Sequence, residues 1–221
     1  MLQFFMKKTI ITLLVASVTL LAYEIKQTPI PFGEQRISLT KAYIKSHYNL
    51  SVGDIKIVPK IVLIHYTAID SYEKSLGRFT QETLPTDRPD LVNAGAVNVS
   101  IHFLVERDGT IHQLMPLDFM ARHVIGLNYS SIGIENVGGE NSKENLTSAQ
   151  LQANIFLVNY LREKFSTIEY VAGHQEYRCF EKSPLWLESD KNYRTQKHDP
   201  GENFMRDLRA NIKGFKEAPC D

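Results

Sequence analysis

The sequence predicts an α/β fold in which a central mixed β-sheet of about five or six strands carries helices on both faces. Short apolar runs typical of strands alternate with segments of helical periodicity, and a hairpin signal lies near the middle of the chain. The length of 221 residues, 43% of them hydrophobic, suffices for one sizeable core. We therefore expect a single domain.

Charge is balanced, with 25 Lys and Arg residues against 25 Asp and Glu residues. No global electrostatic field draws the chain toward nucleic acid or an anionic surface, so we expect no nucleic-acid partner. Recognition must come from a local site. The composition leaves the oligomeric state open.

Residues 1–22 depart from this average composition. Two lysines precede an uncharged apolar run over 10–22, which is too short for a comfortable membrane span. This pattern is typical of a signal peptide, with Ala22 as the small residue at the cleavage site. Tyr23 stands where a lipoprotein would need its cysteine. We expect a periplasmic or secreted protein with no membrane span after processing; an uncleaved N-terminal anchor is the alternative.

Residues 23–57 are polar and mixed, and predict an N-terminal arm that packs across the surface of the domain formed by residues 58–221. The first core strand, over 61–64, is a continuous β-branched run typical of a strand covered on both faces. It delivers His65 to its C-terminal end, a position that ligand sites favour.

The next segments predict a helix, a loop and a hairpin. Asp70 and Glu73 can cap a helix that should end before Pro85. A loop over 83–97 could rim a substrate groove. Alternating apolar residues over 101–114 predict a hairpin with an Asp-Gly turn.

The second half of the chain continues the alternation. A fourth strand ends at Glu135, whose charge is costly in an apolar stretch unless it is paired or used. Thr147 and Gln150 match the capping box that opens the clearest helix. A fifth strand over 168–171 leads to a Gly-His pair, and a final helix begins near Pro200.

Three potential metal ligands stand at strand edges or tight turns: His65, His174 and Asp199. Two imidazoles and one carboxylate suit one zinc ion with an open fourth position for water, whose pKa the metal lowers to roughly 7. The ligands lie far apart in the sequence, so no local spacing rule identifies the site. Taken singly, each has a structural alternative, as a satisfied strand-end histidine or as a turn or cap aspartate.

The only cysteines are Cys179 and Cys220. In an oxidising compartment they could pair and close a loop of about 40 residues, worth on the order of 3 to 4 kcal/mol in the chain-entropy model. Two unpaired thiols are the alternative.

Five motifs stand in order along roughly residues 60–212: His-Tyr-Thr-Ala at 65–68, Ser-Ile-His-Phe-Leu-Val-x-Arg-Asp-Gly at 100–109, Ser-Ile-Gly-Ile-Glu at 131–135, Gly-His at 173–174 and Lys-His-Asp-Pro-Gly at 197–201. Together they resemble the motifs of the zinc-dependent N-acetylmuramoyl-L-alanine amidases, which have the type 2 amidase and peptidoglycan-recognition-protein fold. The resemblance is greatest to the branch that binds zinc with His, His and Asp, which includes the periplasmic and anhydromuropeptide amidases.

The resemblance implies that His65, His174 and Asp199 bind Zn²⁺, that Glu135 is the general base, and that Lys197 faces the developing oxyanion. The implied reaction cuts the amide bond between N-acetylmuramic acid, or its anhydro form, and the L-alanine of the stem peptide, with peptidoglycan or muropeptides as substrate. The alternative for Glu135 is a structural ion pair, and for Lys197 a solvated loop position. Rival functions are a non-catalytic peptidoglycan-binding module of the same fold and an exported amidase effector against competing bacteria.

His102 and His123 are candidate substrate-binding residues. His102 could line the pocket or merely fill the sheet, and His123 has Arg122 beside it where the family often shows tryptophan. His112 and His198 are expected at surface or turn positions. The stretch over 175–196 is longer than the family's usual spacing, and we expect it to form a wall beside the metal.

Overall fold

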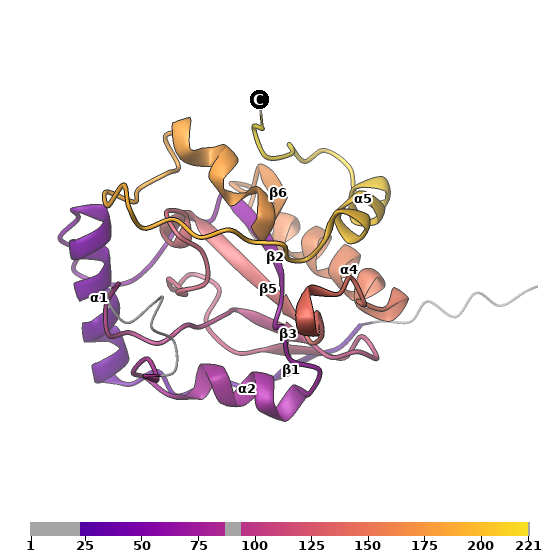
Figure 1. The fold of residues 1–221 in the computed structure, drawn as a ribbon, viewed down its shortest axis with the longest axis horizontal. Helices are drawn as coiled ribbons and strands as arrows, with labels where there is room; N and C mark the ends of the chain where they lie inside the picture. Colours follow the sequence, from indigo (N-terminus) through magenta and orange to yellow (C-terminus); the bar gives the residue numbers. More distant parts are fainter. Residues whose placement is uncertain (1–22, 87–93, 221) are drawn as a thin grey trace, which may run out of the picture.

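The computed structural model describes residues 23–86 and 94–220 (Figure 1). The predicted signal peptide, residues 1–22, lies outside the described residues, as does the middle of the predicted loop, residues 87–93. In the described part of the chain, no helix is long and apolar enough to cross a membrane.

A six-stranded mixed sheet forms the centre of the molecule, as predicted, with the strand order β1-β4-β3-β5-β2-β6. The β3–β4 pair is antiparallel and is the predicted hairpin, while β1–β4, β3–β5, β5–β2 and β2–β6 are parallel pairs. The strands are β1 (Ile25–Gln27), β2 (Ile61–Tyr66), β3 (Phe103–Val105), β4 (Ile111–Gln113), β5 (Ser131–Asn136) and β6 (Tyr170–Gly173).

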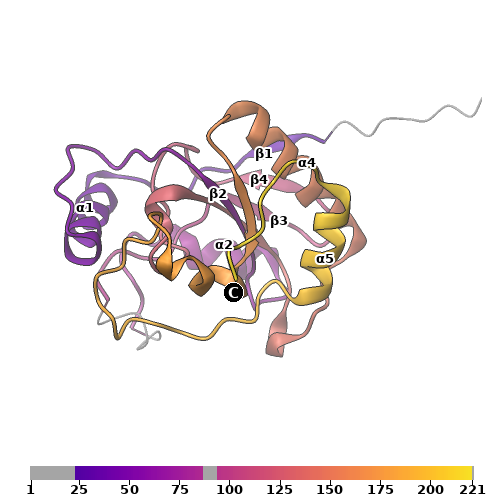
Figure 2. The same cartoon turned by 90° about the horizontal axis from the view of Figure 1, so that it is seen from above.

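Helices cover both faces of this sheet, also as predicted. The helices α4 (Ser148–Lys164) and α5 (Glu202–Asn211) share one hydrophobic core with the strands, whereas α2 (Tyr72–Thr80) packs on the opposite face through Phe79. Figures 1 and 2 show α1 (Glu34–Tyr48) and α5 at opposite sides of the molecule. Three short 3₁₀ helices complete the described elements: η1 (Asn128–Ser130), η2 (Glu140–Ser142) and η3 (His174–Lys182).

Strand alternation decides which side chains face the site. In β2, Val62 and Ile64 belong to the core under α4 and α5, so His65 points to the other face. In β5, Ile132 and Ile134 join the same core, so Glu135 points the same way as His65.

The N-terminal arm is more regular than expected. Its strand β1 extends the sheet beside β4, and its helix α1 is 15 residues long. This helix was not predicted because its buried face mixes polar and apolar residues and shows no continuous apolar stripe. Arg36, for example, is fully buried and donates from its guanidinium to the carbonyls of Phe79 and Gln81 at the end of α2.

The helix caps match expectation in α4 but shift by one residue in α2. Both hydrogen bonds of the Thr147–Gln150 capping box are present. In α2 the capping side chain is Ser71, whose Oγ accepts from the backbone N–H of Lys74 at 3.4 Å. Asp70, the predicted cap, lies 4.0 Å from the Arg107 guanidinium instead.

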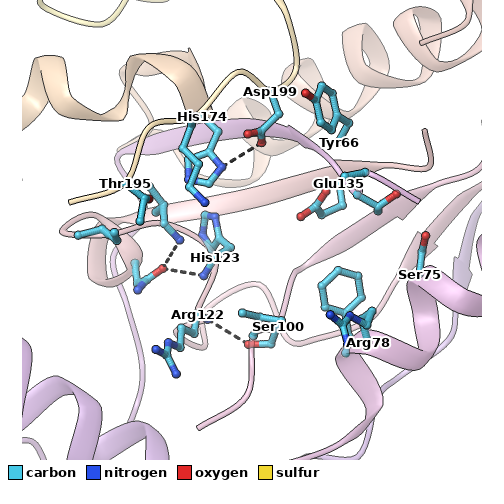
Figure 3. A pocket seen from close by; sticks show the side chains of 18 of the residues that line it. Tyr66, Ser75, Arg78, Ser100, Arg122, His123, Glu135, His174, Thr195 and Asp199 are labelled. Atoms are coloured by element: carbon cyan, nitrogen blue, oxygen red, sulfur yellow. Dashed lines mark hydrogen bonds and ion pairs between the residues drawn. The ribbon is translucent and has the colours of Figure 1, made fainter. Parts of the chain in front are cut away.

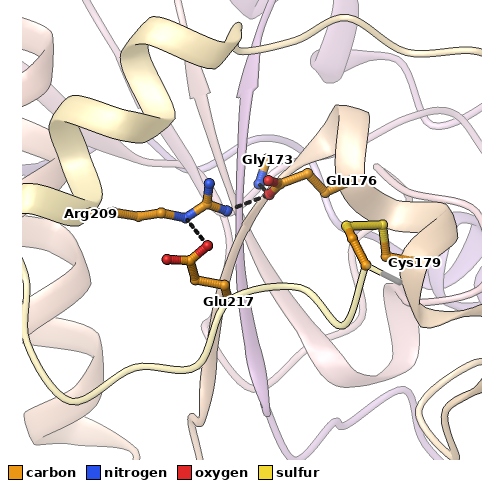
Figure 4. Close-up of a disulfide and its surroundings, with 6 residues drawn as sticks. Gly173, Glu176, Cys179, Arg209 and Glu217 are labelled. Atoms are coloured by element: carbon orange, nitrogen blue, oxygen red, sulfur yellow. Dashed lines mark hydrogen bonds and ion pairs between the residues drawn. A yellow bond between two sulfur atoms is a disulfide. The ribbon is translucent and has the colours of Figure 1, made fainter.

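Cys179 and Cys220 form a disulfide (Figure 4). The bridge joins η3 to the C-terminal tail across 41 residues of sequence. The same tail pairs with β6, since Val171 N–H donates to the Lys216 carbonyl at 3.1 Å. The tail is thus fastened to the element that begins at His174.

Candidate metal centre and pocket

The three predicted ligands converge at the C-terminal ends of β2 and β6. His65 Nδ1 lies 2.9 Å from His174 Nδ1 and 3.2 Å from Asp199 Oδ2, and His174 Nδ1 lies 2.9 Å from the same oxygen. One donor atom from each residue lies within 4.8 Å of the others, and all three residues are buried. Two nitrogens and one carboxylate oxygen aimed at a common point are a donor set for one divalent metal ion.

The electrostatics of this cluster favour the metal-binding protonation states. Burial lowers the pKa of His174 to about 4, although the Asp199 carboxylate opposes this effect. Burial tends to raise the pKa of Asp199, but the imidazoles of His174 and His65 outweigh burial, and the net shift is downward. At neutral pH the cluster therefore holds a neutral His174 and an ionised Asp199, the forms that coordinate metals.

A chain of hydrogen bonds orients the His65 ring through Nε2, the nitrogen that faces away from the other two ligands. His65 Nε2 lies 2.9 Å from His123 Nδ1, and His123 Nε2 lies 3.2 Å from Ser131 Oγ, which donates to the Leu127 carbonyl at 2.8 Å. A proton on each Nε2 satisfies the whole chain and leaves His65 Nδ1 free of hydrogen to face the other ligands. Gly133 makes room for this arrangement, because a Cβ there would lie 2.7 Å from His123 Nδ1.

Glu135 stands beside His65 and lines the pocket. Its Oε2 atom is buried and has no hydrogen-bond partner among the described residues, and no ion pair joins it to another described residue. Burial raises the pKa of Glu135 well above 4.5, the Asp199 carboxylate adds to this rise, and Lys197 opposes it. These surroundings favour a proton-exchanging carboxyl over the structural ion pair considered as its alternative.

A pocket of about 390 Å³ opens beside the metal ligands. Figure 3 shows His174, Asp199 and Glu135 along one side of it, and Ser75 and Arg78 of α2 along another. Four buried polar atoms of pocket-lining residues have no hydrogen-bond partner in the described part of the chain: Glu135 Oε2, Ser75 Oγ, Thr195 Oγ1 and Asn128 Nδ2. Because an unpaired buried polar group is costly, the pocket is suited to a polar ligand.

The long stretch over 175–196 forms part of the wall, as expected, through Tyr193 and Thr195, and Lys197 follows them into the pocket. Helix α1 contacts this stretch through His47. His47 Nδ1 lies 2.9 Å from Glu188 Oε2, and His47 Nε2 lies 3.0 Å from the Ala94 carbonyl, all in buried positions. Both ring nitrogens of His47 thus lie within hydrogen-bond distance of an acceptor.

Histidines outside the ligand set fall into different environments. His102 has no exposed surface, donates from Nε2 to the Phe119 carbonyl at 2.9 Å and accepts from Gly133 N–H at 3.1 Å. It does not line the pocket, so we correct its predicted substrate-binding role to that of a sheet-filling residue, whose pKa burial lowers to about 4. His123 does line the pocket.

Of the two histidines expected at surface or turn positions, His198 agrees with the prediction and His112 does not. His198 is exposed and lies outside the ligand cluster, in agreement with a turn position. His112 is buried, not at the surface. It lies 2.9 Å from the Thr28 hydroxyl and 2.8 Å from a Glu106 carboxylate oxygen.

Several residues that shape the site were not found from the sequence. Asn128 Oδ1 accepts from the backbone N–H groups of His123 and Val124, at 2.8 Å each, and so fixes the turn that carries His123. Arg122 is buried, with its guanidinium 4.9 Å from the Tyr43 ring, and donates to the Ala94 carbonyl at 3.0 Å. The Asn128 contacts stay within one turn of the chain, whereas no local pattern signals the Arg122 contact, because Ala94 lies 28 residues away in the sequence.

A buried His-His-Asp cluster at the edge of a mixed sheet, beside an unpaired carboxyl, is a set of residues that could hold one metal ion, of the kind that metal-dependent hydrolases use. Residues 56–202 match the N-acetylmuramoyl-L-alanine amidase family, Amidase_2, and the chain belongs to this family. The match begins after α1, which therefore lies outside the shared region.

Individual relatives agree with this assignment. The endolysin of Klebsiella phage KP32 is 34% identical over 84 residues, which is 36% of this chain and 56% of that protein. The chain thus spans about half the length of the curated relatives it matches.

Two solved structures show the same fold. The N-acetylmuramoyl-L-alanine amidase LysC from Clostridium intestinale URNW has 19% identity and a TM-score of 0.52, covering 87% of this chain and 100% of its own. A selenomethionine AmpD derivative has 22% identity and a TM-score of 0.53, covering 86% and 95%. The predicted type 2 amidase fold is confirmed.

Proposed function

We propose that this protein is a zinc amidase that cuts the bond between N-acetylmuramic acid, or its anhydro form, and the L-alanine of the peptidoglycan stem peptide. The observation that carries the proposal is the convergence of His65, His174 and Asp199 beside Glu135 in one pocket. Membership of the amidase family supports the substrate class.

Zinc fits the donor set best, because two imidazoles and a carboxylate are the ligands of many catalytic zinc sites that keep one position open. When bound, zinc supplies a Lewis acid that polarises a carbonyl and makes water more acidic. The buried, neutral imidazole of His174 and the ionised Asp199 are ready to hold it without prior proton release.

Glu135 moves the proton in this mechanism. Its carboxylate takes a proton from the attacking water and returns it to the nitrogen of the leaving L-alanine. The raised pKa of Glu135, caused by burial and by Asp199, makes the carboxyl basic enough to accept that proton near neutral pH. Its lack of a hydrogen-bond partner leaves Oε2 available for the transfer.

Lys197 stabilises charge on the carbonyl oxygen. It lines the pocket, and its charge already acts on Glu135 and His174, so an ammonium stands close to the reacting groups. A donor aimed at a developing oxyanion is typically worth about 3 to 4 kcal/mol of barrier. His123 keeps its proposed contact with substrate because it lines the same pocket, in addition to orienting His65.

We place the reaction outside the cytoplasm, in the periplasm or the secreted fraction. The support is the lysine-then-apolar pattern of residues 1–22, and peptidoglycan lies on that side of the membrane. Fractionation of cells, with determination of the mature N-terminus, tests this. A protein retained in the cytoplasm with residues 1–22 intact would contradict it.

The test of function is mass spectrometry of muropeptides digested by the wild type and by Glu135→Gln. The wild type should release free stem peptide, and the variant should lose activity by about 10² to 10⁴-fold while keeping its metal. Glu163→Gln on the exposed side of α4 is the matched control. Unchanged release by Glu135→Gln would remove the assigned base, and binding of muropeptides without any release by the wild type would favour the non-catalytic binding module.

A further inference from the structure

His174 and Asp199 lie 25 residues apart, yet their side chains meet at 2.9 Å. The intervening segment must therefore be closed into a loop, and closing a loop costs conformational entropy. A metal site whose ligands are not held together before binding loses affinity, because the metal must then order them. Contacts that fix the ends of this loop therefore bear directly on metal binding.

Gln175, the residue after His174, fixes both sides of the Asp199 position. Its backbone N–H donates to the Asp199 carbonyl at 2.9 Å. Its side-chain Oε1 accepts from the backbone N–H of Gly201 at 3.0 Å. The two bonds span the backbone around Asp199, so the segment that carries one ligand is fastened to the residue next to the other.

The side chains of Pro200 and Gln175 pack closely against Gly173. A Cβ on Gly173 would lie 2.9 Å from Pro200 Cδ and 3.4 Å from Gln175 Cδ, so these residues leave little free space. Gln175 is partly buried here. The amide of Gln175 is thus confined by packing as well as by its hydrogen bond to Gly201.

A second set of contacts, made by Glu176, holds the start of η3 without reaching Asp199. Glu176 Oε2 accepts from Gly173 N–H at 2.8 Å and from the Arg209 guanidinium at 2.6 Å (Figure 4). This contact ties η3 to α5. Gln175 differs from Glu176 because it bonds directly to the residues at and beyond Asp199.

We propose that Gln175 is a positioning residue that holds His174 and Asp199 at metal-binding separation and thereby sets the affinity for zinc. This proposal rests on the proposed function only in taking zinc as the metal. The Gln175 side chain touches neither metal nor substrate in this role. It acts through the backbone of Asp199 to Gly201.

The experiment compares Gln175→Met, which keeps much of the shape and loses the acceptor, with Gln175→Glu, which keeps an oxygen for Gly201 N–H. Gln152→Met, on the exposed face of α4, is the matched control. The purified proteins are titrated with Zn²⁺ against a competing chromogenic chelator, the absorption spectra of their Co²⁺ forms are recorded, and the metal-free forms are melted.

Gln175→Met should bind Zn²⁺ about 10 to 100-fold more weakly than the wild type and show an altered Co²⁺ spectrum. Gln175→Glu should stay within about threefold of the wild type, and Gln152→Met should be unchanged. Gln175→Asn, whose shorter side chain cannot reach Gly201, gives a second test in the same direction if Gln175→Met fails to fold.

A Gln175→Met protein with wild-type zinc affinity would overturn the proposal. So would a lower melting temperature of its metal-free form with no change in zinc affinity or Co²⁺ spectrum, since that is the result of a purely structural role. Zinc-loaded wild type that cuts no muropeptide would refute the proposed reaction and leave the role of Gln175 standing. A wild type that binds no zinc would overturn both.

Discussion

His65 and Glu135 occupy the same register position on adjacent parallel strands, β2 and β5. Their side chains therefore emerge side by side on one face of the sheet. This relationship places the proposed proton-transfer group next to a metal ligand through backbone pairing alone. A ladder of six paired positions, from Ile61 with Ser131 to Tyr66 with Asn136, maintains it.

The burial of Glu135 predicts a pH-dependent stability. Because its pKa is raised above the ordinary 4.5 in the folded protein, the folded state binds the proton more tightly than the unfolded state. The contribution of Glu135 to stability is therefore greatest below pH 4.5 and falls as the pH rises through the folded pKa. Glu135→Gln removes this fall. Calorimetry of the metal-free proteins should show the variant gaining stability relative to wild type as the pH rises.

The same comparison with Glu163→Gln provides the control, because Glu163 is exposed on α4. The difference in stability between Glu163→Gln and the wild type should not grow with pH in the same way. Parallel pH curves for Glu135→Gln and the wild type would show that the Glu135 carboxyl is not held in its neutral form.

His123→Ala should weaken metal binding. The substitution removes the acceptor of the His65 Nε2 proton and frees the ring of His65 to turn. Loss of such a partner typically costs about 10 to 100-fold in metal affinity. The measurement is metal content after dialysis against a graded series of chelator concentrations. His198→Ala, at an exposed neighbour of Asp199, should retain its metal, and equal retention by both variants would contradict the role of His123.

Gly173→Ala should destabilise the protein by about 1 to 3 kcal/mol, the usual cost of overpacking. The new methyl group would stand 2.9 Å from Pro200 Cδ and 3.1 Å from Met205 Cγ. Since Pro200 follows Asp199, the strain should also reduce metal affinity. Gly77→Ala in α2 is the opposite case, because nothing lies within 4 Å of the added carbon. It should stabilise by about 0.4 to 1 kcal/mol in urea unfolding.

Removing the disulfide should lower stability by about 3 to 4 kcal/mol. The test is denaturant unfolding of the double variant Cys179→Ser with Cys220→Ser. Wild type treated with a reductant should match it, because both lack the bridge between η3 and the tail. A reduced wild type as stable as the oxidised protein would show that the contacts of Lys216 with β6 hold the tail without help.

The parts of this fold that the sequence predicts well are those with a strong local pattern. The β-branched run of β2, the Asp-Gly turn of the hairpin and the capping box of α4 each correspond to an observed element. Helix α1 was missed because Arg36, Thr40 and His47 lie on its buried face, so its periodicity is not apolar.

In the candidate site, too, residues in local motifs could be predicted and residues that depend on distant contacts could not. The ligands and Glu135 could be named because they stand in recognisable motifs, at strand ends for His65, His174 and Glu135 and in the loop before α5 for Asp199. His102 stands in such a motif too, but whether it reaches a pocket depends on what covers the strand, and Phe119 lies across it. Gln175 could not be found, because its partners at Asp199 and Gly201 come from a distant segment.

Helix α1 precedes the region shared with the amidase family, yet its His47 contacts Glu188 in the stretch over 175–196. A protein trimmed to residues 56–202 would keep every proposed ligand and still leave the buried Glu188 carboxylate without its contact to His47. Leaving a buried acceptor without its hydrogen-bond partner costs about 1 to 3 kcal/mol. The smallest stably folding part of this protein is therefore larger than the region shared with the amidase family. A truncated protein should begin upstream of α1.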